Sequence, residues 1–100
     1  MPVKKPAQTA VPIQDLIGNR WSPRAFADRP VSGDDLVAVL EAARWAASSN
    51  NMQPWRYIVA TKADAGSYQR MLECLVPGNQ EWAQAAPVLM ISLADLKRPN

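Results

Sequence analysis

Only two segments of this chain have the residue pattern of β-strands, and this small number limits the folds that it can form. Residues 55–61 alternate in character and are rich in β-branched and aromatic side chains, and residues 87–93 form an apolar run. Several helical segments accompany them, which predicts an α+β fold with helices packed on a small sheet. Because a two-stranded sheet is barely stable alone, we expect a fold that is cut short or that gains strands from elsewhere.

The remaining elements follow from helix periodicity and from capping residues. The clearest helix has Ser32 as its expected N-cap, with Asp35 three residues further on. Helices are expected at about 11–19, 33–47, 62–76 and 79–85, the last after a turn at Pro77-Gly78. The predicted organisation is a disordered leader over residues 1–10 and one domain over residues 11–100.

The composition argues against several kinds of chemistry and partner. The sequence has no histidine and one cysteine, Cys74, which excludes a Cys–His pair, a Ser–His triad and an intrachain disulfide. Apolar neighbours make Cys74 typical of a buried structural thiol. A net charge of +2 is too small to indicate a nucleic-acid partner. Because one cysteine cannot form an intrachain disulfide, we expect a reducing, cytoplasmic setting. No metal-ligand spacing, signal peptide or membrane span is evident.

The first candidate ligand-binding group is Arg20, Ser22 and Arg24. These residues alternate in a segment that a proline biases towards an extended shape, so their side chains are expected to point the same way. Such a set suits a phosphate or another anion. The alternative is a pair of surface arginines beside a turn. Trp21 and Ala25 are expected to point towards a core.

Two further polar groups follow along the chain. The loop over residues 48–53 offers hydroxyl and amide groups that could bind the polar edge of a ring or a polyol, or that could simply end a helix. Asn79, close to Trp82, is either a helix N-cap or a ligand-binding amide. The tryptophans that we interpret as core residues are Trp21, Trp45 and Trp55.

Taken in order, these groups resemble the motifs of the nitroreductase family. Arg20-x-Ser22-x-Arg24-x-Phe26 is similar to its first motif, and residues 47–55 are similar to its Pro-Ser-Ser-x-Asn-x-Gln-Pro-Trp loop, with Ala47 replacing proline. Asn79-x-x-Trp82, followed by Ala86-Pro87, resembles the next block. The later family blocks have no counterpart before Asn100. The resemblance therefore implies a nitroreductase-like fold that is truncated relative to the family.

The resemblance also implies a function. Members of the family are FMN-dependent oxidoreductases that take electrons from NADH or NADPH and reduce nitroaromatics, quinones or related small-molecule acceptors. The flavin performs the hydride chemistry, so no catalytic side chain is expected. A homodimer with the flavin at the subunit interface is implied as well. The rival hypothesis is a non-catalytic truncated remnant that acts as a dimerising or flavin-binding module.

The family's flavin contacts can be carried over to the matching residues. Arg20 and Ser22 are implied to hold the FMN phosphate. Arg24 is implied to lie near N1 and O2 of the isoalloxazine ring. The loop is implied to reach the flavin of the other subunit, and the asparagine before Trp82 to bind the pyrimidine edge of the ring. The implied cofactor-binding residues are Arg20, Trp21, Ser22, Arg24, Ser48, Ser49, Asn51 and Asn79.

Overall fold

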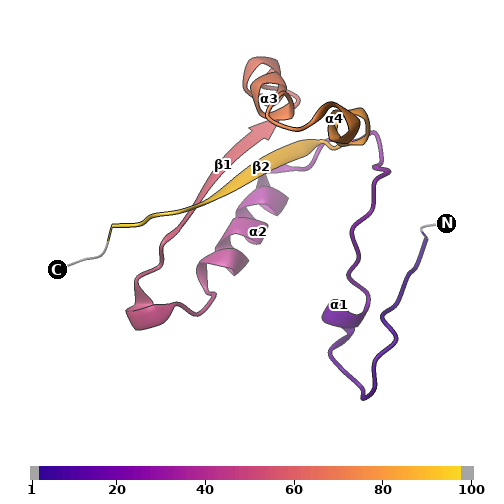
Figure 1. The fold of residues 1–100 in the computed structure, drawn as a ribbon, viewed down its shortest axis with the longest axis vertical. Helices are drawn as coiled ribbons and strands as arrows, with labels where there is room; N and C mark the ends of the chain where they lie inside the picture. The colour runs from indigo at the N-terminus through magenta and orange to yellow at the C-terminus, as the bar shows by residue number, and fades with distance from the viewer. Residues whose placement is uncertain (1–2, 98–100) are drawn as a thin grey trace.

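The computed structural model describes residues 3–97. The two strands form one antiparallel sheet, and the helices lie around it (Figure 1). The predicted α+β fold with helices on a small sheet is confirmed. The elements in chain order are α1 (Asp15–Gly18), α2 (Gly33–Arg44), the short 3-10 helix η1 (Ser49–Asn51), β1 (Trp55–Thr61), α3 (Ala65–Leu72), α4 (Pro77–Ala83) and β2 (Val88–Ala94).

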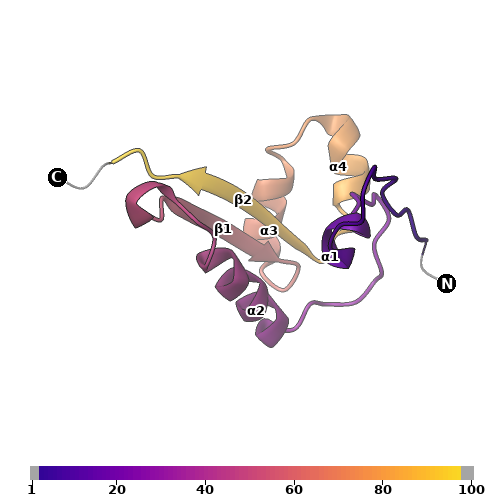
Figure 2. The same ribbon diagram turned by 90° about the horizontal axis from the view of Figure 1, so that it is seen from below.

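The strand register gives each face of the sheet a different helix. Ile58 pairs with Ile91 at the centre of the ladder, and Trp55 pairs with Ala94 at one end. Because side chains alternate along a strand, Trp55, Tyr57 and Val59 share one face and line a hollow below α2. Ile58 and Ala60 share the other face, where α3 packs. Figure 2 shows α2 and α3 on opposite sides of the sheet.

The buried core lies at the α3–α4 end of the sheet. Its cluster contains Ala60, Tyr68, Met71, Leu72 and Ala83, with Leu75, Trp82, Leu89 and Ile91 packed against it. The Tyr68 hydroxyl lies 2.6 Å from the carbonyl oxygen of Ala86, to which it donates a hydrogen bond, and this bond ties α3 to the segment after α4. Burial raises the pKa of Tyr68. In contrast, α2 contributes no buried residue.

Helix α2 begins as predicted and ends earlier than predicted. The Ser32 Oγ accepts a hydrogen bond from the backbone N–H of Asp35 at 3.1 Å, so the expected N-cap is confirmed. The prediction that the helix continues to residue 47 is wrong, because it ends at Arg44. Trp45 leaves the helical conformation, and its indole N–H bonds back to Glu41 at 3.0 Å. Trp45 is 75% exposed, so its interpretation as a core residue is also wrong.

The predicted turn at Pro77-Gly78 is the first turn of α4. Val76 occupies the N-cap position and Pro77 follows at the first helical position, where its fixed φ suits a helix and its missing N–H costs nothing. Asn79 therefore lies inside the helix and is not its N-cap. The structure assigns helix α3 to residues 65–72 only, since Asp64 caps its start and the chain turns after Leu72.

Two other expectations about burial are wrong. Cys74 is exposed, because it follows the end of α3 and so does not share the buried face of that helix. Its thiol donates to the carbonyl oxygen of Arg70 at 3.3 Å. Ala25 is exposed as well, and Trp21 is only half-buried, because their segment runs along the surface.

The N-terminal segment runs over the surface without helix or strand in residues 3–10, where every residue is exposed. The backbone N–H of Ala7 donates to the carbonyl oxygen of Gly18 at 2.7 Å. The disordered leader over residues 1–10 stays a prediction, and residues 1–2 lie outside the described residues, as do residues 98–100 of the predicted domain. Within residues 3–97, the helices are too short or too polar to cross a lipid bilayer.

Candidate functional site

The first group lies in the extended segment between α1 and α2. One terminal nitrogen of Arg20 donates to the Oγ of Ser22 at 3.4 Å, so two of the three side chains expected on one side do point the same way. Both residues are exposed, as is Arg24. Lys5 lies nearby, with its Nζ 4.8 Å from the centre of the Trp21 ring. The segment therefore presents cationic and hydroxyl donors to solvent, an arrangement suited to binding an anion.

Arg24 connects the first candidate group to the group formed by Asn79 and Trp82. Its guanidinium carbon lies 6.0 Å from the centre of the Trp82 ring, within the range of a cation–π contact. Phe26 stacks on the same ring, with ring centres 6.4 Å apart and an interplanar angle of 20°. The indole N–H of Trp82 donates to Oδ1 of Asn79 at 3.2 Å. Arg24, Trp82 and Asn79 thus form a continuous patch, and the Asn79 amide nitrogen keeps its donors for a ligand.

The loop at residues 48–53 has an unusual backbone. Asn50, Asn51 and Gln53 have φ values of 52°, 52° and 49°, in the left-handed region that residues other than glycine seldom occupy. The Oγ of Ser48 accepts a hydrogen bond from the backbone N–H of Gln53 at 3.1 Å. The side-chain amide of Gln53 donates to Oδ1 of Asn51 at 2.9 Å. Strained backbone of this kind persists where surrounding contacts fix it, often at functional sites.

Within one chain, the loop lies far from the other predicted site residues. Both views show η1 at the end of the sheet away from α3, and they show α1 and the segment after it on the other side of the molecule (Figures 1 and 2). The structure therefore brings together Arg24 and Asn79 through Trp82, while Arg20, Trp21 and Ser22 precede Arg24 in the same extended segment. It does not bring Ser48, Ser49 and Asn51 to them.

An ion pair at the end of α2 sits just before the loop. Glu41 accepts hydrogen bonds from Arg44 at 2.7 and 3.0 Å and from the indole of Trp45. The bond from Arg44, followed by that from Trp45, lowers the pKa of Glu41 from 4.5 to about 2. The carboxylate therefore stays ionised and paired with Arg44 at neutral pH.

Sequence reasoning missed Arg56, which contacts the loop. The strand pattern identified it only as the neighbour of Trp55 that points to the opposite face. Its contacts include Asp95, which is remote in sequence, so no local motif could have found the pair. Trp82 was noted only as a companion of Asn79, although it holds both Arg24 and Phe26.

Comparison with known proteins adds independent findings. Residues 17–98 match the model of the Nitroreductase family. A nitrobenzene nitroreductase from Ectopseudomonas oleovorans is 49% identical over 49 residues, which are 49% of this chain and 22% of that protein. A putative NADH dehydrogenase/NAD(P)H nitroreductase from Rhodopseudomonas palustris is 31% identical over 83 residues, which are 83% of this chain and 39% of that protein.

A solved structure resembles the fold closely. It is a crystal structure of an oxidoreductase containing FMN, with a TM-score of 0.81 and 41% sequence identity, and the match covers 87% of this chain and 43% of that one. The predicted nitroreductase-like fold is thereby confirmed. The chain spans less than half the length of these relatives, whose covered shares are 22%, 39% and 43%.

Proposed function

The chain belongs to the nitroreductase family, and from this membership we propose that the protein is an FMN-dependent oxidoreductase. It takes reducing equivalents from NADH or NADPH and passes them to a nitroaromatic, a quinone or a related small acceptor. The FMN in the similar solved oxidoreductase supports the cofactor. The names of the similar nitroreductases support the co-substrate and the acceptor class. A reducing, NAD(P)H-supplied compartment, the cytoplasm, fits the single cysteine.

The observation that carries the proposal is the row of donors in the extended segment after α1, from Arg20 to Arg24, which reaches Trp82 and Asn79 of α4 through Arg24. Arg20 and Ser22 supply charge-assisted and hydroxyl donors for the phosphate, and the backbone of Trp21 lies between them. Arg24 and Asn79 flank the Trp82 ring, which gives a cation and an amide for the polar edge of the flavin. These donors match an anionic tail joined to a planar, hydrogen-bonding ring.

The residues of the chain bind and tune the cofactor. Bound FMN supplies the hydride chemistry, so no side chain has to act as acid or base. A fixed positive charge at Arg24, beside the ring, favours electron uptake because it is already oriented before the reaction. Neither role requires a histidine, which the chain lacks.

The proposed functional unit is a homodimer with the flavin at the subunit interface. The distance of the loop from the first and third groups supports this arrangement, since one chain alone offers only part of the predicted contacts. In a dimer, Ser48, Ser49 and Asn51 of one subunit can reach the flavin that the other subunit holds by its phosphate. Apolar side chains left uncovered on two sides of α2 support the same assembly, with Val37 67% and Val39 58% exposed.

The test is a titration of the purified protein with FMN, followed by flavin fluorescence. Wild type is expected to bind, and Arg20→Ala is expected to bind more weakly by about 1.5–3 kcal/mol, the contribution of one charge-assisted hydrogen bond. Arg70→Ala is the matched control, because Arg70 lies on α3, away from this row of donors. Equal affinity of wild type and Arg20→Ala would contradict the assignment. FMN binding without any oxidation of NAD(P)H would favour the flavin-binding module.

A further inference from the structure

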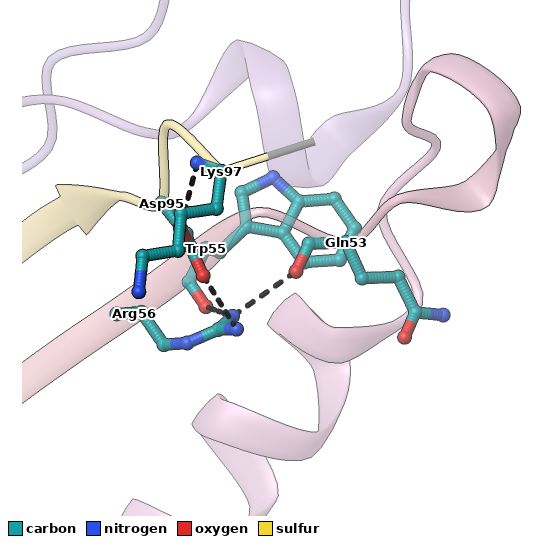
Figure 3. Close-up of polar contacts among 5 residues, drawn as sticks. All are labelled: Gln53, Trp55, Arg56, Asp95 and Lys97. Carbon is teal, nitrogen blue, oxygen red and sulfur yellow. Dashed lines mark hydrogen bonds and ion pairs between the residues drawn. The ribbon is translucent and has the colours of Figure 1, made fainter. Parts of the chain in front are cut away.

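The side chain of Arg56 joins three segments at one end of the sheet (Figure 3). One terminal nitrogen donates to the carbonyl oxygens of Gln53 at 3.1 Å and of Trp55 at 2.7 Å. The other terminal nitrogen donates to a carboxylate oxygen of Asp95 at 3.3 Å. One guanidinium thus holds the end of the loop, the start of β1 and the residue after β2.

Asp95 is itself fixed in position. Its backbone N–H donates to the carbonyl oxygen of Pro54 at 2.7 Å, which continues the strand pairing beyond β2. Its second carboxylate oxygen accepts from the backbone N–H of Lys97 at 2.9 Å. The carboxylate therefore has a defined orientation, and Arg56 meets an anchored partner.

Gln53 is the residue that most needs this support. Its φ of 49° is left-handed, and glutamine lacks the short polar side chain that helps asparagine adopt this conformation. Both of its backbone polar groups bond to side chains: the N–H donates to Ser48 and the carbonyl accepts from Arg56. Ser48 and Arg56 thus hold Gln53 from its two sides.

We infer that Arg56 is a positioning residue for the loop at residues 48–53. Anchored by Asp95, it keeps Gln53 in the left-handed conformation and so sets where Ser48, Ser49 and Asn51 project. The link from the loop to a flavin rests on the proposed function, whereas the hold on the loop stands on the contacts alone. The Arg56 and Asp95 side chains are 58% and 35% exposed, and ion pairs so exposed add little to global stability. The main effect of Arg56 is therefore on the position of the loop and not on the free energy of unfolding.

The hold on the loop is tested without a ligand, by amide hydrogen exchange of residues 48–53. Arg56→Met is expected to speed exchange at the Gln53 amide about tenfold, the equivalent of losing one net hydrogen bond, with little change in Tm. Arg70→Met is the matched control, since it removes the same charge from α3, at the opposite end of the sheet. Asp95→Asn removes only the anchor charge and should raise exchange in the same direction. Unchanged exchange in both Arg56→Met and Asp95→Asn would overturn the inference.

The link to the flavin is tested by FMN affinity in the same variants. Arg56→Met is expected to weaken FMN binding several-fold, while Arg70→Met binds like wild type. Faster exchange with undiminished FMN affinity would overturn the positioning role in the site. If wild type binds no FMN, the proposed function fails, and the exchange measurement still decides whether Arg56 holds the loop.

Discussion

Arg24 is the predicted site residue with the most specific electronic role. Its guanidinium lies over the Trp82 ring, and the indole N–H of Trp82 donates to Asn79. In the proposed function its charge favours electron uptake by the flavin, so Arg24→Ala should make the bound flavin harder to reduce. We expect a midpoint potential lower by about 30 mV, equivalent to ~1.4 kcal/mol for a two-electron couple.

Reduction of the bound flavin against a reference dye measures this shift. Arg24→Lys is the control, because it keeps a positive charge and should lie closer to wild type. If the bound flavin has the same midpoint potential in Arg24→Ala as in wild type, Arg24 does not lie beside the flavin ring.

Tyr68 holds the core through its hydroxyl. That group donates to the carbonyl oxygen of Ala86 at 2.6 Å, and the carbonyls of Ala83 and Gln84 also lie 3.2 Å away. Tyr68→Phe leaves the buried carbonyl of Ala86 without this donor, so the free energy of unfolding should fall by about 1–2 kcal/mol. Urea denaturation measures the change. The matched control is Tyr57→Phe, at a site that is 43% exposed, and an equal loss in both variants would contradict this account.

Single residues were predictable where the cause is local in sequence. Ser32 caps α2 through a backbone N–H three residues away, so the motif alone was sufficient. Cys74 and Trp45 were misjudged because their exposure depends on where their helices end. Arg56 was missed because its anchor, Asp95, lies across the sheet.

At the scale of elements, the end of α2 is sensitive to pH. Its Glu41–Arg44 pair lowers the pKa of Glu41 from 4.5 to about 2. Because the folded-state pKa is the lower one, the contribution of the pair is present above pH 4.5 and is lost as the pH falls through about 2. At neutral pH, Glu41→Gln should therefore have a slightly lower Tm than wild type.

Thermal unfolding of both proteins over this pH range is the measurement. The Tm difference should shrink as the pH falls from about 4.5 to about 2, while it stays constant above that range. A difference independent of pH would mean that the carboxylate charge does not stabilise the helix end.

The elements show which patterns in the sequence are reliable. Strand β1 covers Trp55–Thr61 as predicted, and β2 covers Val88–Ala94, close to the predicted 87–93, because alternation and apolar runs extend over whole strands. Helix ends were less predictable. Pro77 resembled a turn residue but starts α4, because the fixed φ of proline suits both a turn and the first position of a helix.

At the scale of the whole molecule, we expect a dimer. Helix α2 buries none of its residues. Its Val37 and Val39 side chains, which project from different sides of the helix, are 67% and 58% exposed. Light scattering of the purified protein should give twice the mass of its chain. Val37→Lys should shift the mass towards the monomer and weaken FMN binding with it.

The control for this substitution is Val76→Lys, because Val76 is similarly exposed, at 63%, but lies between α3 and α4. A well-folded monomer that binds FMN at full affinity would contradict the shared site. Motif order alone carries no information about distance in space, and it was the resemblance to the family that implied a loop serving the flavin of the other subunit.

The two-stranded sheet also affects how the protein behaves when the segments around the sheet come away from it. Within residues 3–97 each strand has one neighbour, so each offers an outer row of backbone donors and acceptors to any extended chain that approaches. Strand β1 carries the charge of Arg56, which discourages such pairing, whereas β2, Val-Leu-Met-Ile-Ser-Leu-Ala, has no charge, proline or glycine. This composition is typical of segments that nucleate aggregation. β2 is therefore the segment where self-association into fibrils would begin, and a charged gatekeeper at its exposed Leu93 is the natural remedy.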